Sequence, residues 1–156
     1  MRDDIHLIVN ETSLAVEIKI ELLNRFLAKE HELNSILKTD FENEPLLIIE
    51  SEDDIISEIN VQDYIISGLN DEFRNKTGKN LLSSELDQFN DAEGKLANLA
   101  LLRSKEKSII SEISVLRKIN NALMHTVKKE ILEDAEDLKR MRQIEMIIPK
   151  DSRSSF

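Results

Sequence analysis

The stretch PLLIIESEDDIISEINVQDYIISGLNDEF, Pro45 to Phe73, decides the fold class of this chain. Its apolar side chains return every three or four residues, which is the spacing of one face of an α-helix. The first few, LLIIE, would suit a buried β-strand if taken alone, but the pattern continues for about six more turns. We therefore predict a helix with Pro45 in its first turn. Its stripe, interrupted by Glu52, consists of Ile48, Ile55, Ile59, Gln62, Ile66, Leu69 and Phe73.

Two other segments have the same periodicity. Residues 3–38 carry an apolar stripe that includes Val16, Ile20, Leu23, Leu27, Leu33 and Leu37. Residues 84–148 carry another, which consists of Leu99, Leu102, Glu106, Ile109, Ile113, Leu116, Asn120, Leu123 and Val127. After Val127 this stripe shifts by four residues to Ile131, Ala135 and Leu138, a stutter that would locally relax a supercoil.

The sequence thus predicts an all-α fold, an elongated antiparallel three-helix, coiled-coil-like bundle with a long third helix. We expect one domain over residues 1–148, with helices at about 3–38, 45–73 and 84–148, and a flexible tail at 149–156. Residues 74–84, which include Gly78, read as the loop between the second and third helices. About 60 helical residues would extend on the order of 90 Å, so the third helix must project beyond the other two or bend back.

We expect the third helix to start near Ser84, which would place Gly94 inside it. Ser84 and Asp87 have the spacing of a capping pair, which would start the helix there. Gly94 would then lie inside the helix, where glycine costs about 1 kcal/mol relative to alanine.

Composition excludes several classes of function. The chain has no cysteine, which rules out disulfides and thiolate metal sites. Its formal net charge of −10 argues against nucleic-acid binding, which needs clustered lysine and arginine. No apolar run reaches the roughly 20 residues that would span a bilayer, and the N-terminus is too acidic for a secretory signal. We expect a soluble cytoplasmic protein.

Charge is unevenly distributed along the chain. Residues 39–73 contain eleven acidic residues and neither lysine nor arginine, whereas residues 95–129 contain eight basic residues and two acidic ones. Such runs are usually solvated helix faces. They are also compatible with two segments lying side by side, an arrangement that their charges would favour over others.

Catalytic and metal-binding patterns are missing from the sequence. The three histidines are scattered, and the successive residues Glu30, His31 and Glu32 point in different directions on a helix, which indicates surface side chains. Glycine clusters and activated nucleophiles are lacking as well. His125 with Val127 and Lys128 has the outline of a histidine phosphotransfer site, but Lys129 stands where such domains place a small residue. We predict neither an enzyme nor a cofactor.

Asn120 is a polar residue on an apolar stripe, and it has two interpretations. A buried amide fixes the register between helices, because leaving it unpaired is costly. Alternatively, Asn120 marks the point where the third helix leaves its partners and meets water.

In overall pattern the chain resembles the FlgN-like flagellar export chaperones. The resemblance rests on LLNRFLAKEHELNSIL (Leu22 to Leu37), on IISEINVQDYIISGLNDEFRNKTG (Ile55 to Gly78) and on LRKINNALMHTV in the third helix. The chain departs from the family where such proteins carry a lysine early in the second helix, because it has Glu52, Asp53 and Asp54 there.

The resemblance implies a cytoplasmic chaperone that binds unfolded hook–filament junction proteins before type III export, through an amphipathic helix of the client. Carried onto this chain, the implied partner-binding residues are Leu123, Met124, Val127, Ile131, Leu138, Met141 and Ile144, with Met146 beside them. Methionine suits such adaptable helix contacts. The alternative is a structural homo-oligomeric coiled coil, for instance a homodimer, in which these residues pack within the assembly and no unfolded client is bound.

Overall fold

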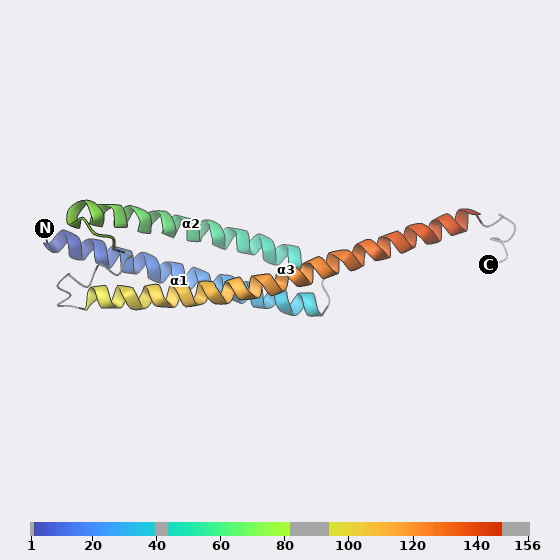
Figure 1. Ribbon diagram of the computed structural model, residues 1–156, viewed down its shortest axis with the longest axis horizontal. Coiled ribbons are helices and arrows are strands. Elements are labelled where there is room, and N and C mark those ends of the chain that lie inside the picture. Colours follow the sequence, from blue (N-terminus) through green and yellow to red (C-terminus); the bar gives the residue numbers. More distant parts are fainter. Residues whose placement is uncertain (1, 40–43, 82–93, 148–156) are drawn as a thin grey trace.

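The computed structural model describes residues 2–39, 44–81 and 94–147, with the side chains of Arg2, Glu44 and residues 144–147 outside the description. These residues form three α-helices and no strand: α1 (Arg2–Lys38), α2 (Glu44–Thr77) and α3 (Lys95–Ile147). The all-α prediction is confirmed, as is the long third helix (Figure 1).

The first helix is the common partner of the other two. α1 packs along both α2 and α3, whereas α2 and α3 have little direct contact. Successive helices run in opposite directions, so α1 and α3 are parallel and α2 is antiparallel to both (Figure 1). Among the described residues, each ion pair between helices also has one partner in α1: Lys19–Asp63, Lys19–Glu106, Lys76–Asp4 and Arg117–Glu30. The acidic α2 and the basic part of α3 are therefore linked through α1.

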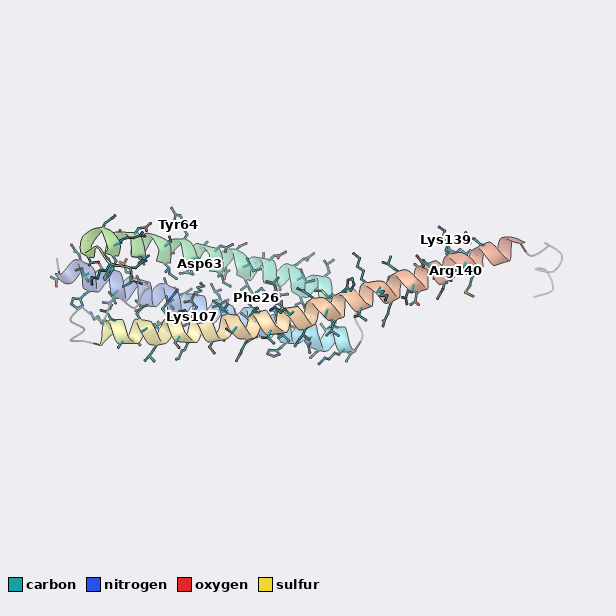
Figure 2. All side chains as sticks on the ribbon, viewed as in Figure 1. Phe26, Asp63, Tyr64, Lys107, Lys139 and Arg140 are labelled. Carbon is teal, nitrogen blue, oxygen red and sulfur yellow. The ribbon has the colours of Figure 1, made fainter. Side chains whose placement is uncertain are left out.

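Three apolar clusters follow one another along α1. The first combines Val16 of α1, Phe73 of α2 and Leu99 of α3, all nearly inaccessible. The second contains Leu23, Phe26 and Ile113, and Figure 2 shows Phe26 in the middle of the bundle. The third contains Leu33, Leu37 and Ile48. The predicted stripes supply all of these residues except Phe26, since side chains three and four apart share one helix face.

Two helix ends that are marked by glycines, the end of α2 and the start of α3, differ from the predicted ones. α2 continues through Thr77, so residues 74–77 are helical and the loop starts at Gly78. Gly78 has a φ of +74°, and its amide donates a hydrogen bond to the Arg74 carbonyl at 2.7 Å, which closes the last turn. Only glycine adopts this left-handed conformation freely, and this ends the helix.

Gly94 lies before α3 and not inside it, which corrects the predicted helix of residues 84–148. Its φ is +68°, which no continuous helix allows, and α3 begins at Lys95. The Gly94 carbonyl accepts a hydrogen bond from the Asn98 amide at 2.9 Å, so Gly94 acts as the N-terminal cap. The Ser84–Asp87 pair and the predicted tail at 149–156 lie outside the described residues.

The third helix passes the ends of α1 and α2 and continues alone (Figure 1). Beyond residue 127, each described side chain through residue 143 is exposed. The helix extends from this point to Ile147, about 30 Å at 1.5 Å per residue. The length of the third helix allowed it either to project beyond the other two helices or to bend back, and the structure shows that it projects.

Candidate partner-binding surface of the third helix

The third helix leaves the bundle at a small apolar cluster. Leu123 and Met124, two of the predicted partner-binding residues, are half-buried there against Leu33, Leu37 and Ile48. They therefore belong in part to the core of the bundle, and the free surface starts after them.

A buried polar layer lies just before this exit point and ties α3 to α1. The Asn120 amide donates hydrogen bonds to the backbone carbonyl of Glu30 at 2.8 Å and to its Oε2 at 2.7 Å. The Asn34 amide donates to Asn120 Oδ1 at 2.9 Å. Asn120 is only 1% exposed, so it does not meet water at this position. Its bonds match the register-setting interpretation.

Glu30 is one of the buried members of this layer, which corrects its interpretation as a surface residue. Its side chain faces α3 and is 3% exposed, while His31 and Glu32 are exposed as expected. Arg117 lies with its Nε 3.7 Å from Glu30 Oε1 and its guanidinium 5.5 Å from the centroid of the Phe26 ring. Glu30 can be buried because two groups of α3, the Asn120 amide and the Arg117 guanidinium, lie against its carboxylate.

Glu52 of α2 completes the layer and faces the Glu30 carboxyl group. It is 4% exposed, and its Oε2 has no hydrogen-bond partner among the described residues. Burial raises the pKa of Glu52 to about 8, with a further contribution from the hydrogen bond to Glu30. The neighbouring Glu30 carboxyl acts in the same direction as burial, because an ionised Glu52 would be repelled by it.

A second buried polar layer separates the first two apolar clusters. Lys19 Nζ donates to Glu106 Oε1 at 2.6 Å and lies 2.5 Å from Asp63 Oδ1. Arg103 Nη1 forms an ion pair with Glu106 Oε2 at 2.7 Å, an oxygen that accepts no hydrogen bond from the described residues. Burial lowers the pKa of Lys19, but the bonds to Asp63 and Glu106 outweigh it and raise that pKa overall. This layer joins all three helices.

The projecting part of α3 carries an apolar stripe that is exposed from Ile131 onward. Ile131, Leu138 and Met141 are 56%, 58% and 59% exposed, and Val127 is half-buried. Ile131 lies eleven residues, about three turns, after Asn120, so the stripe continues the face that α3 buries against α1. We call Val127, Ile131, Ala135, Leu138 and Met141 the docking stripe. Figure 2 shows Lys139 and Arg140 on this projecting part, far from the bundle.

The sequence interpretation missed one exposed apolar residue beside the docking stripe. It also named two residues whose side chains the structure does not describe. Leu132 is 57% exposed beside the docking stripe, and its position one residue after Ile131 was the available signal. Ile144 and Met146 lie in α3, but their side chains are outside the description.

Two grooves on the bundle, one mostly apolar and one lined by both apolar and polar side chains, were also missed. An open groove of about 590 Å³ between α1 and α3 is lined by Leu27, His31, Val115, Leu116 and Ile119, among others. A smaller groove of about 290 Å³ between α1 and α2 includes Ile18, Leu22 and Val61. Leu27, Leu116 and Gln62 belong to the predicted stripes, but the other lining residues lie beside the stripes, so helical periodicity did not indicate a groove at either place.

The described part of the chain offers few other sites. Among these residues no three histidine, aspartate or glutamate side chains gather to hold a metal ion. No described helix is long and apolar enough to cross a membrane. His125 is exposed on α3, half a turn before the half-buried Val127.

Comparison with protein-family models finds no match, and comparisons with curated proteins and with solved structures find none either. The FlgN-like resemblance therefore rests on the sequence patterns alone.

Proposed function

We propose that this protein is a helical chaperone or adaptor that binds a helical segment of another protein along the projecting part of α3. The observation that carries the proposal is the docking stripe, a continuation of a core seam that is left uncovered over about three turns. Isolated apolar residues on a surface are common, but a regular stripe on a helix without tertiary contacts is the pattern of helix-in-groove recognition.

The flagellar part of the proposal is more specific. We propose that the client is a hook–filament junction protein, held in the cytoplasm before type III export. Its support is the FlgN-like sequence pattern, together with an architecture of two shorter helices and a long third helix. The competing function is a structural coiled coil in which a second copy covers the docking stripe.

The first test is hydrogen exchange on the free protein. If the docking stripe is free, amides of α3 beyond Val127 exchange much faster than those between residues 99 and 120, because they lack tertiary protection. Uniformly slow exchange from residue 120 to residue 143 would contradict a client-binding surface and favour the homo-oligomer.

The second test is capture of partners from the native cell with matched variants. Ile131→Ser/Leu138→Ser removes the docking stripe, whereas Glu133→Ser/Arg140→Ser changes the opposite face of the same turns. We expect flagellar junction proteins to be recovered with the wild type and with the control variant, and lost with the stripe variant. Recovery of unrelated structural proteins would reject the flagellar assignment.

A further inference from the structure

The docking stripe has a different charge on each of its two sides. Three acidic residues each precede a stripe residue by one position: Glu130 before Ile131, Asp134 before Ala135 and Asp137 before Leu138. Two lysines each follow one: Lys128 after Val127 and Lys139 after Leu138. At about 100° per residue, these acids lie along one side of the line through Ile131 and Leu138, and the lysines lie along the other. Glu136, after Ala135, and Arg140, before Met141, fall on the far face of the helix.

Both sides are free to contact a partner. We call Glu130, Asp134 and Asp137 the acidic edge, and Lys128 and Lys139 the basic edge. All five side chains are exposed, and no ion pair or hydrogen bond joins them to another described residue. Flanking charges of this kind decide which helix pairs with a stripe and in which direction.

The charges on the two edges disfavour an antiparallel dimer in which the docking stripes of two identical chains pack together. When two identical helices pack stripe to stripe in opposite directions, each edge meets the same edge of the other copy. The acidic edge would face an acidic edge, with Asp134 and Asp137 near the centre of the overlap. Like charges in such positions are destabilising.

A parallel pair would match the edges but is blocked by the bundle. Upstream of the docking stripe, the same face of α3 is covered by α1, to which Asn120 is bonded, and by the cluster of Leu37 and Ile48. A second α3 packed in parallel would bring its own α1 and α2 into the space already filled by the first bundle. A second copy therefore fits the docking stripe poorly in either direction.

We infer that the docking stripe receives an amphipathic helix of a different protein, with lysine or arginine along the edge that meets Glu130, Asp134 and Asp137. The basic residues of this partner helix recur every three or four positions, in step with the acidic edge. Its opposite edge is acidic or neutral, because it faces Lys128 and Lys139. This inference rests on the proposed function and adds the chemistry of the partner.

Synthetic helical peptides with one shared leucine stripe provide the test. The first probe has lysine along one edge and glutamate along the other, and the second has glutamate along both edges. Binding to the full-length protein is measured by fluorescence anisotropy at low and high salt. We expect the first probe to bind about tenfold more tightly, because three charge pairs along the acidic edge are attractive with this probe and repulsive with the second. High salt should reduce the difference.

A charge-reversal variant supplies the matched control. Glu130→Lys/Asp134→Lys/Asp137→Lys should reverse the order of the two probes, while Glu133→Lys/Glu136→Lys, on the far side of the helix, should preserve it. Equal binding of both probes that still depends on Ile131 and Leu138 would overturn the inference and leave the proposed function intact. Failure of both probes to bind would reject both. A dimer in sedimentation that Ile131→Ser/Leu138→Ser dissolves would also overturn the inference.

Discussion

The side-chain amide of Asn120 on α3 donates two hydrogen bonds to Glu30 on α1, one to its backbone carbonyl at 2.8 Å and one to its Oε2 at 2.7 Å. One amide group thus uses both of its hydrogens on a single residue of the neighbouring helix. The contact holds the last buried polar layer before α3 leaves the bundle, and it makes α1 and α3 adopt a single register.

Replacement of Asn120 tests this relationship directly. Asn120→Leu leaves the buried Glu30 without its main donor, so we expect a loss of about 2–3 kcal/mol in the free energy of unfolding. Urea unfolding followed by circular dichroism would measure it. Asn121→Leu, at the exposed neighbouring position, should change stability by less than about 0.5 kcal/mol. Equal losses of stability from the two substitutions would show that the Asn120 side-chain amide does not fix the register between α1 and α3.

The Glu30–Glu52 pair predicts a particular dependence of stability on pH. The pKa of Glu52 is raised from 4.5 to about 8 on folding, so between these values the folded state holds a proton that the unfolded state has released. Stability from this group is present at low pH and is lost as pH rises from about 4.5 through 8, by at most about 1.4 kcal/mol per pH unit.

Glu52→Gln isolates this effect, because glutamine imitates the protonated carboxyl at every pH. We expect the variant and the wild type to have similar stabilities near pH 5 and the variant to be more stable above pH 8. Chemical denaturation over this pH range would measure the difference between them. Parallel curves would mean that Glu52 is ionised in the folded protein at neutral pH.

The Lys19 layer should show a strong coupling between its members. Lys19→Met leaves Glu106, which is 3% exposed, with Arg103 alone, and we expect a loss of about 2–4 kcal/mol. The double variant Lys19→Met/Glu106→Leu should recover much of this, because it removes both buried charges. Arg25→Met, which breaks an exposed pair with Glu21, is the control and should have little effect. A double variant less stable than Lys19→Met would contradict the expected coupling.

The three glycines should respond to alanine with different signs. Gly68 lies within α2 with open space around its missing side chain, so Gly68→Ala should stabilise the protein by about 0.5–1 kcal/mol. Gly78 and Gly94 have positive φ angles, and alanine there should destabilise by about 1 kcal/mol. Thermal unfolding would compare the three variants. Stabilisation by Gly94→Ala would indicate that α3 continues through this position after all.

Much of the fold could be predicted from the sequence, because side chains on one helix face repeat at short range. The stripe from Leu99 to Val127 is the face that α3 buries or half-buries, and the stripe of α2 is buried or half-buried in the same way. The start of α3 could not be placed, because the conformation of Gly94 is not visible in the spacing of apolar residues. The exposed stretch after Val127 coincides with the predicted stutter in the stripe.

Asn120 could be predicted as a buried polar residue, but its partners and the order in which the helices pack could not be predicted from the sequence. Glu30 was interpreted as a surface residue, since its burial depends on Asn120, 90 positions away. Complementary charge on α2 and α3 suggested direct contact, but charge totals do not say which helix lies between two others. In the structure, Lys19 of α1 bonds to both Asp63 of α2 and Glu106 of α3.

The continuity of α3 from Lys95 to Ile147 has a mechanical consequence. The helix is one uninterrupted element, so the direction in which the docking stripe points is fixed by the register of α3 in the bundle. A molecule bound there is therefore held at a fixed distance from the bundle and in a fixed direction around the axis of α3. One residue inserted after Lys129 would advance the stripe by about 1.5 Å but rotate it by about 100°, and would turn the bound molecule with it.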